Sequence, residues 1–145
     1  MNRLMVWALL ASMVVFLPGC GAPRTDDTDI TMIDLTTLRS AMEEDRKSPK
    51  HLVIIDPRPG AKFAEGHIPG SINLRLPDVD RVEGRNPAIA GHHMIVVYGQ
   101  DPASAVAKGM TKKLIELRYK RVKMYGGGIT DWEAAGLSLE KSPGG

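Results

Sequence analysis

Two short apolar runs dominate the hydrophobic pattern of the chain, at residues 51–55 (HLVII) and 94–98 (MIVVY). Runs of this length without polar alternation are typical of strands buried on both faces, as in a parallel sheet covered by helices. Turn-forming residues follow each run, at 56–58 (DPR) and 99–101 (GQD). The pattern therefore predicts two central strands, each ending in a loop.

Apolar positions at helical spacing predict two longer helices. The first helix follows capping residues at 34–36 and ends before Pro49. The second helix begins with Asp101 as its N-cap and Pro102 in its first turn. Its apolar face is predicted to consist of Val106, Met110, Leu114 and Leu117.

Shorter elements alternate with these. Strands are predicted at 30–33, 71–74 and 121–125, short helices at 61–65 and 129–135, and a loop-rich segment at 77–91. Alternating strands and helices favour an α/β fold with an open parallel sheet. Ligands of such folds bind beyond the carboxyl ends of the strands, so we expect any site to lie between residues 56–58 and 99–101.

The first twenty residues have the pattern of a targeting segment. Arg3 precedes an apolar run at residues 4–17, which is shorter than a membrane-spanning helix requires. The run ends in Leu-Pro-Gly-Cys at 17–20, which resembles the lipobox of bacterial lipoproteins, where cleavage precedes the cysteine and the cysteine is acylated. An uncleaved anchor helix and a buried core helix are the alternatives.

Composition narrows the function. The 145 residues carry 19 Lys and Arg against 17 Asp and Glu, a net charge of +2, and cleavage before Cys20 would leave +1. This balance argues against a protein defined by nucleic-acid binding. A single cysteine excludes an internal disulfide, a CxxC redox pair and a multi-cysteine zinc site.

Three segments together resemble the rhodanese-like domain family. They are residues 53–74 (VIIDPRPGAKFAEGHIPGSINL), 95–98 (IVVY) and 122–136 (VKMYGGGITDWEAAG). The resemblance implies an α/β fold with a small, open, mainly parallel five-stranded sheet and helices on both faces. It also implies relatedness to sulfurtransferases, in which a cysteine after the IVVY-type strand carries a persulfide within a ring of backbone N–H groups.

The sequence departs from this pattern where the catalytic cysteine belongs. Gly99 occupies that position, and an alignment from the helix side offers residues 101–104 instead, none of which is cysteine. Persulfide chemistry needs a thiolate as nucleophile and carrier, and Ser104 cannot replace it. Asp101 adds a negative charge to the loop, and Pro102 removes an N–H donor. Cys20, acylated or on a tether, is not expected to substitute.

Several other residues have both a functional and a purely structural interpretation. Asp56 and Arg58 are candidate pocket residues with Gly99, Gln100, Asp101 and Ser104, and Arg58 is the cation nominated for an anionic ligand; an ion pair at the strand end is the alternative. His67 is expected to be structural, and Trp132 to pack a helix. His92 and His93 lack further ligands at metal spacing, so no metal site is predicted.

A run of basic residues surrounds the last predicted strand. It comprises Lys112, Lys113, Arg118, Lys120, Arg121 and Lys123, interrupted by Glu116. A solvated face is one interpretation, and weak attraction to anionic lipid headgroups is the other.

We therefore expect a signal peptide at 1–19, a lipidated Cys20 with its tether at 20–29, a rhodanese-like domain at 30–140 and a tail at 141–145. The function expected is a non-catalytic binding module, without cofactor, anchored to a cell or outer membrane and facing the periplasm or exterior. Its other partner would be a protein or a small anion. An enzyme of altered chemistry in the same crevice and a structural envelope scaffold are the alternatives.

Overall fold

Residues 25–142 are described by the structure, which is a computed structural model; the predicted signal peptide, Cys20 and the end of the C-terminal tail lie outside this range. The elements follow one another as η1 (Asp27–Asp29), β1 (Met32–Ile33), α1 (Leu35–Lys47), β2 (Leu52–Asp56), α2 (Gly60–Glu65), β3 (Ile72–Asn73), α3 (Leu76–Asp80), β4 (Met94–Tyr98), α4 (Ala105–Glu116), β5 (Val122–Tyr125) and α5 (Gly128–Ala134).

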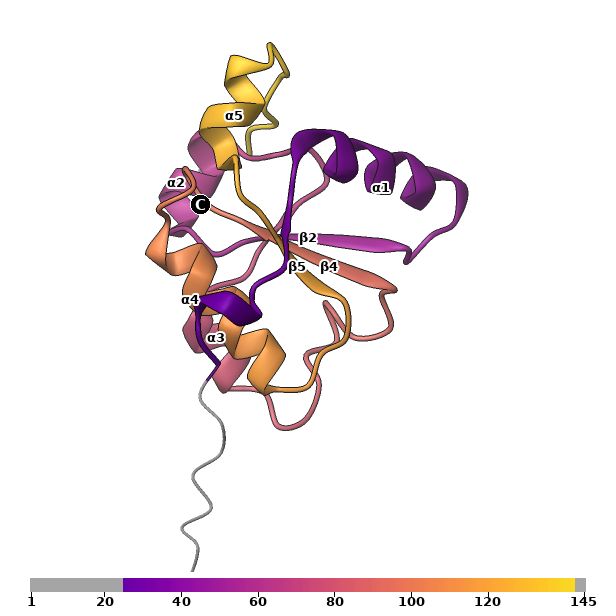
Figure 1. Cartoon of the computed structure of the whole chain (residues 1–145), viewed down its shortest axis with the longest axis vertical. Helices are drawn as coiled ribbons and strands as arrows, with labels where there is room; N and C mark the ends of the chain where they lie inside the picture. The colour runs from indigo at the N-terminus through magenta and orange to yellow at the C-terminus, as the bar shows by residue number, and fades with distance from the viewer. Residues whose placement is uncertain (1–24, 143–145) are drawn as a thin grey trace, which may run out of the picture.

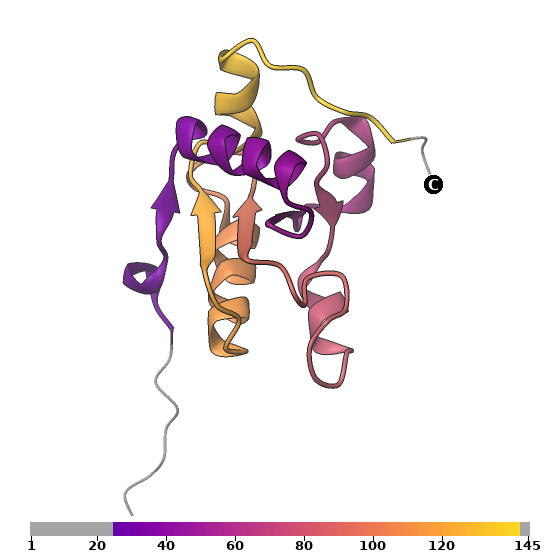
Figure 2. The same ribbon diagram turned by 90° about the vertical axis from the view of Figure 1, so that its right-hand side faces the viewer.

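The five strands form one sheet in the order β1-β5-β4-β2-β3, and every neighbouring pair is parallel. The predicted fold class, an α/β domain with a five-stranded parallel sheet, is confirmed. All carboxyl ends of the strands therefore point to one end of the domain, which is the upper end in Figure 2.

Helices cover both faces of the sheet. Leu38 of α1 and Trp132 of α5 are buried in one cluster with Ile54 of β2 and Val96 of β4. Met110 and Leu114 of α4, with Val79 of α3, are buried on the other face against Val53, Ile55 and Val97. Alternate residues of β2 and β4 thus belong to opposite clusters, as the two uninterrupted apolar runs require. Figures 1 and 2 show α1 and α4 on opposite sides of the strands.

The start of the second long helix differs from the prediction. Ser104, rather than Asp101, precedes the first turn of α4. Asp101 begins a tight turn instead, because its side-chain Oδ1 accepts the Ala103 N–H at 2.8 Å and its carbonyl accepts the Ser104 N–H at 3.2 Å. Asp-Pro is a turn signal as well as a capping signal, and here the turn prevails.

The buried face of α4 is also rotated relative to the prediction. Met110 and Leu114 are fully buried as expected, but Val106 and Leu117 are 42% and 39% exposed. Ala107 and Thr111 complete the buried face, and Thr111 is accommodated because its hydroxyl donates to the Ala107 carbonyl at 2.8 Å. A pattern of apolar residues cannot predict that this threonine is buried, because threonine counts as polar in such a pattern.

Two further short elements were not predicted. The segment 77–91, expected to be loop, includes most of α3, of which Val79 alone is buried. Residues 27–29, expected to be tether, form η1, whose Asp27 bonds to Lys112 Nζ at 2.9 Å and Lys108 Nζ at 3.3 Å. The described part of the chain thus contacts α4 before the first strand begins.

Candidate functional site

The predicted site lies at the carboxyl ends of the two central strands. β2 and β4 pair in register from Leu52↔Met94 to Ile55↔Val97, so Asp56 and Tyr98 end neighbouring strands. The loops that follow are therefore adjacent, at the end of the sheet where ligands of open α/β folds bind. Both apolar runs were located correctly, and this is why the position of the two loops could be predicted.

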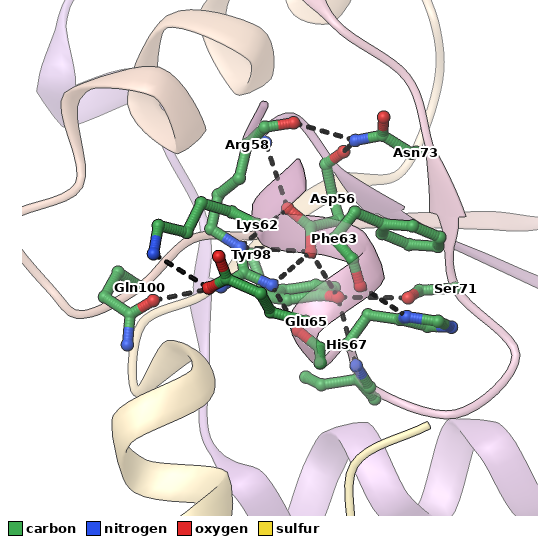
Figure 3. A network of polar contacts seen from close by, with 12 residues as sticks. Asp56, Arg58, Lys62, Phe63, Glu65, His67, Ser71, Asn73, Tyr98 and Gln100 are labelled. Carbon is green, nitrogen blue, oxygen red and sulfur yellow. Dashed lines mark hydrogen bonds and ion pairs between the residues drawn. The ribbon is translucent and has the colours of Figure 1, made fainter. Parts of the chain in front are cut away.

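Asp56 and Arg58 form a buried ion pair. The Asp56 carboxylate is fully buried, and Arg58 is 6% exposed. The Arg58 Nη2 lies 2.7 Å from Asp56 Oδ2, and its Nε donates to Asp56 Oδ1 at 3.0 Å (Figure 3). Tyr98 donates its hydroxyl to Asp56 Oδ2 at 2.7 Å. The carboxylate is thus neutralised and hydrogen-bonded, which a buried charge requires.

The remaining donors of Arg58 join the surrounding segments. Its Nη1 donates to Gln100 Oε1 at 3.0 Å, and its Nη2 also donates to the Gly66 carbonyl at 2.7 Å. Asn73 Nδ2 donates to the Asp56 and Arg58 carbonyls at 2.9 and 2.8 Å. The two loops that were expected to border a crevice are therefore bridged, and the ion-pair interpretation of Arg58 matches the structure.

Burial shifts the proton equilibria of this network. Burial raises the pKa of Tyr98 far above its usual value, and the neighbouring Asp56 charge raises it further. Burial alone would lower the pKa of Arg58, but its hydrogen bond and charge interaction with Asp56 outweigh this, so the pKa is raised. Both groups stay protonated throughout the physiological range, and they act as fixed donors rather than as acid–base catalysts.

Gly99, which an alignment from the strand side places at the position of the family's catalytic cysteine, has no space for a side chain. A Cβ built on Gly99 would overlap the Oγ and Cβ of Ser104 and would lie 3.0 Å from the Ala107 Cβ. Ser104 thus occupies the volume that a residue-99 side chain would need. Among residues 25–142, the Ser104 hydroxyl forms no hydrogen bond with a histidine, lysine or carboxylate.

Two N–H groups of the loop, those of Ala103 and Ser104, are engaged by Asp101. Asp101 accepts from Ala103 through its carboxylate and from Ser104 through its carbonyl, and Pro102 has no N–H. The carboxylate of Asp101 therefore sits where a nest of N–H groups would hold an external anion. Gln100 turns its side chain toward Arg58 instead.

The start of α5 closes the loop from the other side. The N–H groups of Ile129 and Thr130 donate to the Gly99 and Gln100 carbonyls at 3.0 Å each. Gly128 has φ +62°, and a Cβ there would lie 2.6 Å from the Gly99 oxygen, so only glycine allows this approach. Residues 126–128 thus connect β5 to α5 in a turn that packs against the loop.

A hollow lies beside this loop, at the carboxyl end of β1. It has a volume of about 800 Å³ and is lined by Met32, Ile33, Asp34, Thr37, Pro102, Gly127, Thr130, Asp131 and Ala134. None of the six predicted pocket residues lines it. Burial and a 2.6 Å hydrogen bond to Asp131 raise the pKa of Tyr125 at its edge. The sequence could not indicate this groove, because three distant segments form it and no motif marks them.

His67 and Trp132 both pack within the domain and form hydrogen bonds to backbone carbonyls. His67 is buried, and its Nδ1 lies 2.8 Å from the Phe63 carbonyl oxygen. Its ring stacks on the Phe63 ring, with the two ring centroids 3.7 Å apart (Figure 3). Trp132 is buried and donates to the Ser138 carbonyl at 3.0 Å, as expected of a packing residue. Within residues 25–142, no cluster of three or more metal-binding side chains occurs. Across that same range, no helix has the length and hydropathy to cross a membrane.

Comparison with known proteins agrees with this geometry. The model of the family described as "Rhodanese-like domain" matches residues 35–135. A Synechococcus elongatus protein named "Putative thiosulfate sulfurtransferase" is 27% identical over 117 residues, or 61% of this chain and 37% of that protein. The chain therefore spans little more than a third of that relative's length.

Solved structures share the fold. The rhodanese-like domain of an Anabaena protein is 24% identical, with a TM-score of 0.59 over 77% of this chain and 79% of that one. A human single-domain sulfurtransferase is 19% identical, with a TM-score of 0.57 over 71% of this chain and 95% of that one. At these identities the likeness concerns the fold alone.

Proposed function

Because the chain belongs to the rhodanese-like domain family, we propose that it is a family member without sulfurtransferase activity that serves as a lipid-anchored binding module of the cell envelope. The observation that carries this proposal is Gly99. It stands where active relatives have their sulfur-carrying cysteine, and Ser104 fills the space beside it.

The chemistry of sulfur transfer supports this reading. A thiolate must attack the sulfur donor, release the remainder of the donor, and hold the transferred sulfur as a persulfide until an acceptor arrives. The chain encodes one thiol, at Cys20, which lies in the lipobox-like segment. Lipidation that joins this sulfur to a glyceryl carbon gives a thioether, which can neither attack a sulfur donor nor carry a persulfide.

The loop that would stabilise the persulfide is altered as well. Asp101 engages two of its N–H groups, and a third position is proline. An anionic donor such as thiosulfate would meet the Asp101 carboxylate, while Arg58 is held by Asp56, Gln100 and Gly66. A loop without a thiol, with two N–H groups engaged by Asp101 and with Arg58 held in an ion pair, supports a binding role over an enzyme of altered chemistry.

The groove at the carboxyl end of β1 is the surface that best suits a binding module. Its volume of about 800 Å³ lies within the range of small-molecule sites, and apolar Met32 and Ile33 stand beside the carboxylates of Asp34 and Asp131. A partner segment that combines an apolar side chain with a cation fits this lining. An envelope protein or peptide is therefore a better match than a free anion.

The test uses full-length protein extracted from membranes. Its intact mass should show loss of residues 1–19 and addition of acyl chains at Cys20. Thiosulfate-to-cyanide sulfur transfer should not exceed that of a heat-denatured sample. A Cys20→Ser variant should remain inactive and should lose the lipid.

Two results would overturn the proposal. Sulfur transfer by the wild-type chain that disappears in Cys20→Ser would place catalysis on that thiol. Sulfur transfer that persists in the variant would reveal a different nucleophile, for which Ser104→Ala and Asp101→Asn are the next variants to assay.

A further inference from the structure

Five cations meet at the end of the domain opposite the candidate site. We call this surface the basic end; it comprises Lys50, Arg85, Arg118, Lys120 and Arg121, all exposed. None of the five forms an ion pair with an acid among residues 25–142, although Glu83 and Glu116 lie in the same segments. They come from loops that precede β2, β4 and β5, so the fold brings together charges that are spread along the chain.

Direct contacts join these loops into one surface. The His93 N–H donates to the Lys50 carbonyl at 3.0 Å, and the Arg121 Nη1 lies 2.8 Å from His93 Nδ1. Arg85 Nη2 donates to the Arg118 carbonyl at 3.1 Å, and its guanidinium stacks over Tyr119. These contacts connect the three loops that carry the cations.

The lysines of α4 differ from these five. Lys108 and Lys112 bond to Asp27 at 3.3 and 2.9 Å, and Lys113 bonds to Asp80 at 2.5 Å. The basic run that the sequence shows around β5 thus contains two different sets, with Lys123 in neither. The α4 lysines are neutralised within the domain, whereas Arg118, Lys120 and Arg121 keep an uncompensated charge.

The backbone gives a second indication that these charges are functional. Among the described residues, the non-glycine positions with positive φ are Lys50 (68°), Arg118 (60°) and Arg121 (55°), and all three belong to the basic end. Glycine and asparagine adopt this conformation most readily. The chain instead places a cation at each turn, against the preference of the backbone, and such strain concentrates where it serves a function.

The path of the chain brings this end near a membrane, if the lipid anchor of the proposed function exists. In both views the described chain begins at the lower end of the domain, the end at which the turn between α4 and β5 also lies (Figures 1 and 2). Cys20 lies five positions before Thr25. Five residues span at most about 17 Å whatever their conformation, so an acylated Cys20 would keep the basic end within reach of the headgroups.

We infer that the basic end docks on anionic phospholipid headgroups and holds the domain with the candidate-site loop and the groove facing away from the membrane. The charge is complementary to an anionic surface, and the tether would hold Thr25, where the described chain begins, within about two Debye lengths of that surface. Nucleic acid is a poorer match because the whole chain is nearly balanced in charge.

The test reads orientation in vesicles with two matched labels. Ala88 and Ala103 are both exposed; Ala88 lies in the loop at the basic end, whose Asn86 N–H donates to Tyr119 Oη at 2.7 Å, and Ala103 lies in the candidate-site loop. Full-length Ala88→Cys and Ala103→Cys proteins are labelled with a fluorophore and reconstituted into phosphatidylcholine vesicles with or without phosphatidylglycerol. A quencher is attached to the headgroups.

We expect phosphatidylglycerol to increase quenching at residue 88 and to leave residue 103 unquenched, and high salt to reverse the increase. Arg118→Asn/Lys120→Gln/Arg121→Asn should lower the docked population roughly fivefold per charge removed. Lys108→Gln/Lys112→Gln/Lys113→Gln removes the same net charge from the paired set and should have little effect. Asparagine preserves the left-handed turns at 118 and 121.

The outcomes separate the two proposals. If the chain does not sediment with either kind of vesicle, the lipid anchor of the proposed function is wrong. If it sediments with both but quenching at residue 88 does not depend on phosphatidylglycerol, or if the two triple variants behave alike, the docking inference is wrong. Equal quenching at residues 88 and 103 would also overturn it.

Discussion

At the scale of single residues, the decisive contact is between Gly99 and Ser104. A missing cysteine could in principle leave an open loop that one substitution restores. Here the serine side chain has taken the vacant volume, so the loop is packed around glycine. The glycine at 99 and the position of the Ser104 side chain are thus structurally coupled.

This contact predicts a non-additive pair of substitutions. Gly99→Ala should destabilise the domain by about 1–3 kcal/mol, because its Cβ overlaps Ser104 and the neighbouring backbone must shift. In a Ser104→Gly background the same change should be much less damaging. Urea unfolding of the four proteins completes the double-mutant cycle. Equal effects of Gly99→Ala in both backgrounds would show that Ser104 does not fill this space.

The buried ion pair predicts a larger effect. Arg58→Ala removes the cation from a fully buried carboxylate and should lower the free energy of unfolding by about 3–5 kcal/mol. Adding Asp56→Asn should recover part of this loss, since the uncompensated charge is then gone. Denaturant titration measures both. The exposed pair of Lys62 and Glu65 provides a control, and Lys62→Ala should change stability by less than about 1 kcal/mol.

At the scale of elements, sequence patterns succeeded where one strong signal acted alone. The apolar runs located β2 and β4 within a residue, because both faces of these strands are buried. The patterns failed where two signals competed, because Asp101 and Pro102 favour both a helix start and a turn. They also failed on α4, where the buried face includes the polar residue Thr111. α3 was not predicted because a single buried residue, Val79, cannot show the helical spacing of apolar residues.

The N-cap of α1 gives a prediction with a pH dependence. The Asp34 carboxylate accepts the Thr37 N–H at 2.8 Å, and its hydrogen bonds with Thr37 hold the pKa of Asp34 below its usual value. The stabilisation is fully present above the pKa of the unfolded chain, about 4, and is lost as pH falls through the lower folded-state value.

Asp34→Ala should therefore lower the unfolding midpoint at neutral pH, and the difference from wild type should shrink in acid. Asp34→Asn keeps a capping oxygen without a titrating group, so it should retain most of the stability at neutral pH. Unfolding curves at several pH values test both statements. A difference between Asp34→Ala and wild type that stays constant down to strongly acidic pH would contradict the assigned cap.

At the scale of the whole molecule, sequence alone predicted the fold class but not what lies between segments. The Arg58–Gln100 bridge joins residues 42 positions apart, and the groove at the carboxyl end of β1 unites residues 32–37 with Pro102 and 127–134. The division of the basic run into paired and unpaired sets likewise depends on Asp27 and Asp80, which are far from it in the chain. Only the packed domain determines these relationships.

The basic end predicts opposite effects on stability and on membrane docking. Its cations repel one another, and three of them occupy turns that favour asparagine or glycine. Arg118→Asn/Lys120→Gln/Arg121→Asn should therefore raise the unfolding temperature of the full-length protein, by roughly 2–6 °C, while it weakens docking. Lys108→Gln/Lys112→Gln/Lys113→Gln removes ion pairs and should not raise it. Differential scanning fluorimetry in detergent compares the three proteins. If the first triple variant proved less stable than wild type, these residues would be supporting the fold, and their conformation would no longer argue for a docking surface.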